Sequence, residues 1–164
     1  MADEQPQAPA QQQLVLQKIY VKDLSFESPK APAIFTTSVS PQTQINIRTS
    51  AQEVAPSTHE VTLTLTVEAK DQDATVFLIE IAQAGVFSLE GYTPEERSAL
   101  LGSFCPNTLY PFAREAIADV ALRGGFPQLL LQPINFDSLY ARAMRDAGTR
   151  NGGAAAGVSG GETH

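Results

Sequence analysis

The residues that could carry acid–base, nucleophilic or metal chemistry are few in this sequence. It contains two histidines and one cysteine in 164 residues. His164 ends the chain, and His59 has no cysteine or paired carboxylates near it in sequence, so we expect His59 to be a solvated loop residue. Cys105 stands in an FCPN stretch without a CxxC partner or a basic activator. This setting favours a small core residue over a nucleophile.

Sequence motifs for cofactors are also missing. The chain has no zinc-ligand spacing, no Walker loop and no GxGxxG stretch after a predicted strand. We therefore expect a protein that is not an enzyme and that uses no cofactor or metal. A small-molecule-binding enzyme is the least favoured function, because no group of residues would supply a polar pocket.

Three carboxylates are better placed for binding than for catalysis. Asp23 and Glu27 are four residues apart in an extended segment, so they share a face at a separation of about 13 Å, too far for an acid–base pair. Glu80 shares a strand face with Val76 and Leu78, where a lone charge is unfavourable unless the face is exposed or a cation meets it. Two interpretations follow: a solvated sheet edge, or an acidic docking surface for a basic partner.

Four segments have the alternation of β-strands. The clearest spans 60–68, where four aliphatic side chains point one way and three threonines point the other. The others span 14–24, 45–48 and 75–82. An Asp-Gln-Asp turn at 71–73 joins the third strand to the fourth. Consecutive hairpins of this kind predict an antiparallel meander.

After the strands the apolar period becomes helical. Residues 93–96 form a capping-box start, and a long apolar stripe follows until Gly-Gly at 124–125 ends it. Pro106 and Pro111 are expected to bend or split the beginning of this stretch. A second, shorter helix is predicted after Asn135. The fold class is therefore α+β: a four-stranded antiparallel sheet followed by one long and one shorter helix.

Composition predicts one domain with two loose ends. Hydrophobic residues make up 43% of the chain, enough for one core. Residues 1–13 have almost no bulky apolar side chain and 148–164 are rich in Gly and Ala, so we expect both to be disordered around a folded domain at 14–147. A net charge of -7 with scattered Lys and Arg argues against nucleic acid. With no predicted signal or membrane-spanning stretch, we expect a cytoplasmic protein.

Apolar surface exceeds what one subunit can bury. Several predicted strands are apolar on both faces, which predicts a homo-oligomer. Residues 28–41 hold three prolines around Ile34, Phe35 and Val39. This pattern indicates a long irregular crossover whose apolar side chains are available for binding.

Several stretches together resemble the SecB family of protein-export chaperones. Residues 19–29 (IYVKDLSFESP) resemble its first strand, and 104–107 (FCPN) with 110–115 (YPFARE) resemble its first helix. Residues 125–129 (GFPQL) and 133–137 (PINFD) resemble the turn into its last helix. The motifs occur in the family's order over about residues 14–147, and only the two ends lie outside them.

The resemblance implies an ATP-independent holdase that keeps precursor proteins unfolded and delivers them to the translocation motor SecA. It implies a homotetramer, built as a dimer of dimers, with sheets joined across subunits and the long helices between dimers. It also implies that the basic, zinc-bearing tail of SecA docks on the acidic sheet face. The positions in this sequence that match are Asp23, Glu27, Leu78 and Glu80.

Clients in this family lie in long hydrophobic grooves that involve the crossover loop and the last helix. The matching residues here are Ile34, Phe35 and Val39 in the loop and Leu139 and Tyr140 in the helix. Val39 departs from the family, because the best-known members carry a tryptophan there. Less aromatic area weakens anchoring, although aliphatic surface still suits a promiscuous groove. The alternative function is a non-enzymatic adaptor subunit that binds one folded partner through its acidic sheet face.

Overall fold

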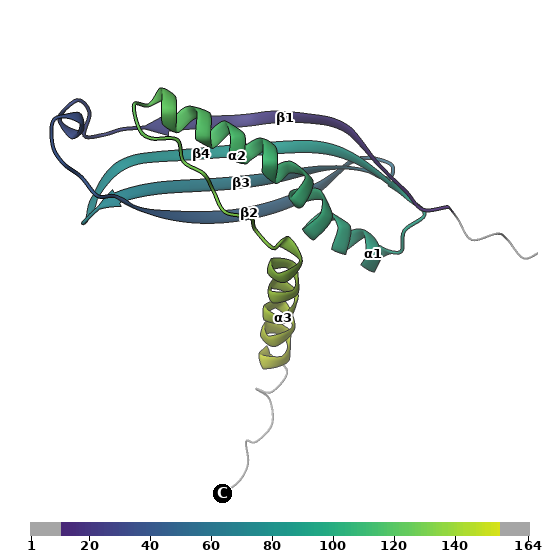
Figure 1. Ribbon diagram of the computed structural model, residues 1–164. Helices are drawn as coiled ribbons and strands as arrows, with labels where there is room; N and C mark the ends of the chain where they lie inside the picture. Colours follow the sequence, from purple (N-terminus) through teal and green to yellow (C-terminus); the bar gives the residue numbers. More distant parts are fainter. Residues whose placement is uncertain (1–10, 155–164) are drawn as a thin grey trace, which may run out of the picture.

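A computed structural model of the protein describes residues 11–154 (Figure 1). The strands are β1 (Gln13–Glu27), β2 (Gln42–Ala55), β3 (Thr58–Asp71) and β4 (Ala74–Glu90), with a short 3-10 turn η1 (Ala33–Phe35) between the first two. The helices are α1 (Pro94–Ala99), the π-helical turn η2 (Leu100–Phe104), α2 (Cys105–Arg123) and α3 (Phe136–Ala154). The predicted α+β class, with its four-stranded antiparallel sheet followed by helices, is confirmed.

The strand order is β1-β4-β3-β2, and every pair is antiparallel. Two hairpins make β2, β3 and β4 a meander, as predicted. β1 is joined to β2 by a long crossover between Glu27 and Gln42, as predicted for residues 28–41, and this crossover carries the chain from one edge of the sheet to the other. Figure 1 shows this crossover looping past the ends of the strands. β1 and β2 are therefore the two edge strands.

The strands are longer than the sequence pattern predicted. β2 covers Gln42–Ala55 in place of 45–48, and β4 continues to Glu90 in place of residue 82. Both extensions are polar or contain small residues, so they lack the apolar alternation that marks a strand. They are extended because each is hydrogen-bonded along its length to β3, whose register with both neighbours is almost unbroken.

The helical layer begins as predicted. The Glu96 backbone N–H donates to the Thr93 hydroxyl at 3.2 Å, and the Thr93 backbone N–H donates to the Glu96 carboxylate at 2.9 Å, which completes a capping box. α1, η2 and α2 follow without a break, and α2 ends at the predicted glycine pair, where Gly125 has a φ of 88°. The predicted split is present as the π-helical turn η2 just before Pro106, whereas Pro111 lies inside α2 without interrupting it.

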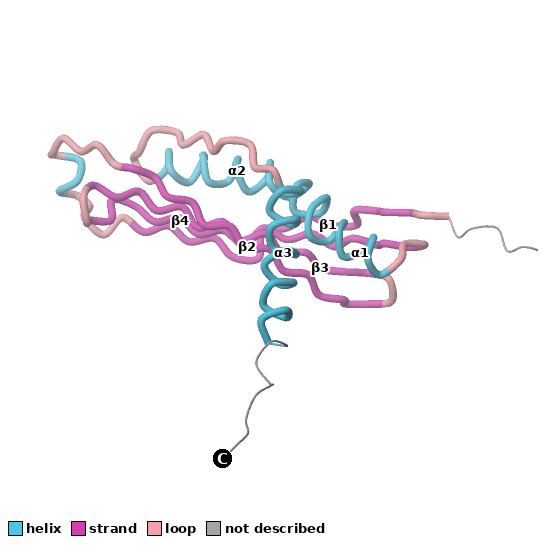
Figure 2. Tube along the Cα trace, turned by 90° about the horizontal axis from the view of Figure 1, so that it is seen from below, coloured by secondary structure: helices cyan, strands magenta, loops and turns pink. Residues whose placement is uncertain are grey.

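One face of the sheet is covered by α2 and carries the core. Figure 2 shows α2 lying against the sheet over part of the length of the strands. From the sheet, Val61, Leu65, Ile79 and Phe87 are fully buried. The helix meets them with Leu109, Ala113, Ile117 and Ala121, which recur every four residues and are also fully buried. We call this the covered face and the opposite one the open face.

The two residues that could have been reactive differ in outcome. Cys105 is a buried core residue, as predicted, and burial raises the pKa of its thiol to about 12. The prediction for His59 is wrong. His59 lies within β3 opposite Phe87 and is only 6% exposed, because the β2–β3 turn is tight and the strand already resumes at Thr58. Its Nδ1 has no hydrogen-bond partner among the described residues, and its Nε2 lies 3.8 Å from a carboxylate oxygen of Glu53.

The structure describes part of the two terminal segments predicted to be disordered, and there it shows regular secondary structure. β1 starts at Gln13, the last residue of the predicted arm. α3 continues to Ala154, seven residues beyond the predicted end of the domain at 147. Once a helix is nucleated, each further residue adds one backbone hydrogen bond, so a glycine-containing stretch can continue it. The remainder of both predicted ends, 1–10 and 155–164, lies outside the described residues.

Candidate functional site

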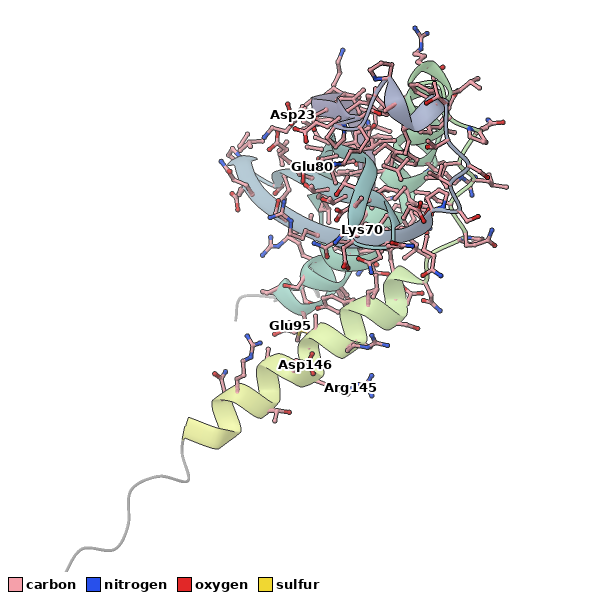
Figure 3. All side chains as sticks on the ribbon, turned by 90° about the vertical axis from the view of Figure 1, so that its left-hand side faces the viewer. Asp23, Lys70, Glu80, Glu95, Arg145 and Asp146 are labelled. Atoms are coloured by element: carbon pink, nitrogen blue, oxygen red, sulfur yellow. The ribbon has the colours of Figure 1, made fainter. Side chains whose placement is uncertain are left out.

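The open face holds the four residues predicted to form a docking surface. Along β4, Leu78 and Glu80 alternate with the buried Ile79 and Ile81, so they point away from α2. In the antiparallel register Glu27 pairs with Leu78, Ser25 pairs with Glu80, and Asp23 pairs with Ala82. Directly paired residues share a face, so all four side chains belong to one patch. Figure 3 shows Asp23 and Glu80 near one another on the sheet.

Glu80 is not at a sheet edge. β4 lies between β1 and β3, so the interpretation of Glu80 as a solvated edge residue is wrong in its location. Its carboxylate is partly buried and accepts a hydrogen bond of 2.9 Å from the Thr66 hydroxyl on β3. Asp23 and Glu27, by contrast, are exposed on the edge strand β1. The patch thus has one carboxylate held in place and two that are freely hydrated, which suits recognition of a basic group.

A polar network beside this patch was not predicted. Tyr20 on β1 reaches over β4 and donates its hydroxyl hydrogen to the Glu60 carboxylate on β3, and the Lys22 ammonium forms an ion pair of 2.9 Å with the same carboxylate. Ala84, the β4 partner of Tyr20, is small enough to let the ring pass. Simple alternation from Asp23 would put Tyr20 on the covered face, and the β-bulge between Val21 and Asp23 returns Tyr20 to the open face. Tyr20 meets Glu60 because the strand order is β1-β4-β3.

The network shifts two pKa values in opposite directions. The hydrogen bond from Tyr20, followed by that from Lys22, lowers the pKa of the Glu60 carboxyl. The hydrogen bond to Glu60, with burial, raises the pKa of Tyr20 to about 12. Glu60 therefore contributes stability above its unfolded pKa that is lost as pH falls through its folded pKa. Tyr20 contributes stability below its unfolded pKa that is lost as pH rises toward 12.

Replacing Tyr20 by phenylalanine should therefore destabilise the fold in a pH-dependent way. We expect a loss of about 1 kcal/mol at pH 7, because one hydrogen bond to a partly exposed charged group is removed. The difference between wild type and variant should shrink as pH falls through the lowered folded-state pKa of Glu60, where its carboxylate becomes protonated. Urea unfolding at several pH values measures it, with Tyr92→Phe as the control. A difference that is constant with pH would contradict the assignment.

An apolar groove lies at the other edge of the sheet, on the covered face. It has a volume of about 630 Å³, and its floor is β2. Its walls are η2 and the first half of α3. The residues that line it are Ile45, Ile47, Thr49, Ser50, Ala51, Ser98, Leu101, Gly102, Phe136, Leu139, Tyr140 and Ala143. Because the lining is mostly aliphatic and aromatic and the groove is open, it offers surface to an extended or helical segment of another chain.

The residues predicted for client binding lie in two separate parts of the structure, the groove and the crossover. Leu139 and Tyr140 line the groove. Ile34 and Phe35 lie in the crossover, away from it, and Val39 follows them in the same segment. The groove residues that the sequence analysis missed are Ile45, Ile47 and Leu101. The alternation of Ile45 and Ile47 was visible in the sequence, but nothing local indicated that a helix from the end of the chain would lie opposite them.

The crossover has its own apolar contacts in an aromatic cluster. The Phe35 ring lies 5.4 Å from that of Phe126, which lies 4.8 Å from Phe77, and Phe26 stacks on Phe77 at 6.4 Å between ring centres. Phe35 nevertheless keeps 52% of its surface exposed. The cluster thus ties the crossover to the turn after α2 while leaving an aromatic surface open to a partner.

Among residues 11–154, no group of three or more His, Cys, Asp or Glu side chains is arranged to hold a metal ion. No helix in that same part of the chain is long and apolar enough to cross a membrane.

An α+β fold that combines an acidic open face with an apolar groove defines a protein that binds other polypeptides. Comparison with known proteins gives this class a family. The family model described as preprotein translocase subunit SecB matches residues 7–147. The protein-export protein SecB of Hahella chejuensis is 49% identical over 142 residues, covering 87% of this chain and 89% of the relative. That of Nitrosococcus oceani is 53% identical over 137 residues, covering 82% and 84%.

The chain belongs to the SecB family, whose members are chaperones of protein export and not enzymes. A solved structure agrees in fold. A SecB-like chaperone of Mycobacterium tuberculosis, in complex with a peptide from the HigA1 antitoxin, is similar with a TM-score of 0.63. The match covers 74% of this chain and 90% of the other at 18% identity, and so supports the fold alone.

Proposed function

We propose that this protein holds unfolded precursor polypeptides without ATP and delivers them to the translocation motor SecA. The observation that carries the proposal is the open groove of about 630 Å³ between β2 and α3. The similarly folded M. tuberculosis chaperone is known in complex with a peptide, which supports a polypeptide as the occupant. Client segments lie along β2 against Leu139 and Tyr140, and Ile34, Phe35 and Val39 extend the apolar surface at the crossover.

Binding of this kind needs no nucleotide. Each apolar side chain of a client that enters the groove contributes about 1 kcal/mol, so affinity comes from several contacts engaged at once. Folded proteins have already buried such side chains and present few of them. The chaperone therefore holds a polypeptide that folds slowly and does not hold one that folds quickly. The held polypeptide is released when it is transferred to the motor.

Asp23, Glu27, Leu78 and Glu80 form the motor-docking surface in this proposal. The three carboxylates supply the negative charge, and Leu78 supplies an apolar contact between them. The basic tail of SecA is complementary to this patch in charge. The groove is on the covered face and the docking surface is on the open face, so a client and the motor can bind at the same time.

A homotetramer in the cytoplasm completes the proposal. β1 is an edge strand with unpaired backbone groups on its outer side, and Val21 and Leu24 on it are 49% and 41% exposed. Beside it, Phe112 on α2 is 46% exposed. Exposed apolar side chains next to an open strand edge favour pairing with a second copy. Native mass spectrometry at micromolar concentration should find four subunits, and four subunits with one client after addition of an unfolded precursor.

A groove substitution tests the client site. Ile45→Ser should weaken binding of a reduced, unfolded polypeptide about fivefold, because one half-exposed aliphatic contact of about 1 kcal/mol is lost. Asn46→Ser, the next residue on β2 and on the opposite face, is the matched control. Fluorescence titration with several unrelated unfolded chains measures both affinities. Equal affinity of the two variants would reject this groove, and binding only to one native partner would favour the adaptor function.

A further inference from the structure

α3 is attached to the rest of the fold at one end only. Its first residue, Phe136, is buried and packs edge-on against Tyr110 with ring centres 5.8 Å apart. The Asn135 side-chain oxygen accepts a hydrogen bond of 3.0 Å from the Ser138 backbone N–H and so caps the helix start. Every residue from 141 to 151 is exposed. Figures 1 and 2 show α3 running away from the strands after its first turns.

The seat of α3 is the π-helical turn η2. The Tyr140 ring lies directly on the backbone at Gly102, where an added Cβ would be 2.8 Å from the ring carbon Cε2. The neighbouring Ser103, which is buried, donates its hydroxyl hydrogen to the Asp137 carboxylate. Two successive residues of η2 therefore hold two residues of α3 that are three apart and lie on one side of the helix. π-helical turns are rare and often occur at functional positions.

The same contacts divide two apolar hollows. Gly102 and Tyr140 line the groove of about 630 Å³. Tyr140 also lines a second hollow of about 450 Å³, together with Tyr92, Leu100 and Phe104. Residues of η2 and of α3 line both hollows, so the contact between η2 and α3, with the Tyr140 ring pressed against Gly102, is the partition between them. If α3 tilts off η2, the partition leaves with it and the two hollows join.

We propose that α3 is a movable wall of the client groove, and that Gly102, Ser103, Asp137 and Tyr140 are the positioning residues that set how bulky a client segment the groove accepts. The inference rests on the proposed client site. With α3 seated, the groove takes segments with small aliphatic side chains. With α3 lifted, the joined hollow takes aromatic ones. The seat is a small contact at one end of a long helix. A client that binds better to the lifted than to the seated position of α3 therefore shifts the equilibrium between these two positions toward the lifted one.

Gly102→Ala tests the seat, with Gly148→Ala as the control on α3, where an added Cβ meets nothing within 4 Å. Spin labels at Ala147→Cys and Gln52→Cys report the distance from α3 to β2. The native Cys105 is buried and is therefore protected from the labelling reagent. Labelled chains are diluted into unlabelled ones to remove distances between subunits. Gly102→Ala should lengthen and broaden this distance, and Gly148→Ala should leave it unchanged.

Two unfolded peptides of equal length and charge, one rich in valine and one in tryptophan, then test selectivity. Gly102→Ala should raise the ratio of tryptophan-peptide to valine-peptide affinity by about threefold or more. In the Tyr140→Ala background the same substitution should change nothing further, because the ring it displaces is absent. Ser103→Ala should act in the same direction as Gly102→Ala, whereas Asp137→Asn, which keeps an acceptor for Ser103, should resemble wild type.

The outcomes separate this inference from the proposed function. Failure of the wild type to bind either peptide counts against the client site, while the spin-label distances still report on the seat. Wild-type binding with unchanged distances or an unchanged affinity ratio in Gly102→Ala overturns the movable wall and leaves the client site standing. A change that persists in the Tyr140→Ala background also overturns it. If Gly102→Ala does not fold, Ser103→Ala with the same two readouts decides.

Discussion

Replacing both Asp23 and Glu80 by arginine should abolish the proposed docking on the basic tail of SecA while client binding remains. The register puts Glu80 opposite Ser25 on the open face, beside Asp23 and Glu27. Two attractive charges become repulsive, and the arginine at position 80 also leaves the Thr66 hydroxyl without its acceptor. We expect affinity for the tail to fall by about 100-fold or more. Calorimetric titration with the zinc-loaded tail peptide measures it.

The control for this double reversal is Asp73→Arg with Glu95→Arg. Both residues are exposed and lie off the open face, at the β3–β4 turn and in the first turn of α1, and the net charge changes by the same amount. In the control, tail affinity should fall only slightly, because the net negative charge of the protein is reduced. At 0.15 M salt the Debye length is about 8 Å, so charges farther than that from the bound tail contribute little to its affinity. If the double reversal binds the tail as tightly as wild type, the docking surface is elsewhere. If both variants lose affinity equally, the attraction is not local.

Truncating Leu109 to alanine should have the largest effect on stability. Leu109 is fully buried where α2 crosses the covered face, so the substitution removes apolar burial and leaves a cavity. We expect the free energy of unfolding to fall by about 2–5 kcal/mol. This is a large share of the roughly 5–15 kcal/mol that stabilises a typical domain. Urea unfolding at one fixed protein concentration measures it, because association of subunits would make stability depend on concentration.

Leu122→Ala on the same helix is the matched control for Leu109→Ala. Leu122 is 59% exposed in the single subunit, so its truncation should change the free energy of unfolding by about 0.5 kcal/mol or less. Equal effects of the two truncations would mean that α2 does not pack on the sheet as described. A large effect of Leu122→Ala alone would instead locate Leu122 in a contact between subunits.

Features set by nearest neighbours in the chain were predictable from the residues. The capping box at Thr93, the end of α2 at Gly124 and the buried alternation of β3 each depend on dihedral preferences or on one side-chain period, and the structure has all three. The open-face position of Glu80 follows from the same period. The motifs between 19 and 137 were also enough to indicate the family to which the chain belongs.

Features set by which elements become neighbours in space were decided only by the tertiary structure. β1 lies beside β4, so Tyr20 reaches Glu60 across it. His59 is buried because of a tight turn and a neighbouring strand, and Ile45 lines a groove because α3 returns to β2 from the end of the chain. Each depends on a register or a long-range packing contact between segments tens of residues apart. A local pattern determines which face a side chain is on only where the register is unbroken, and it does not determine what lies opposite.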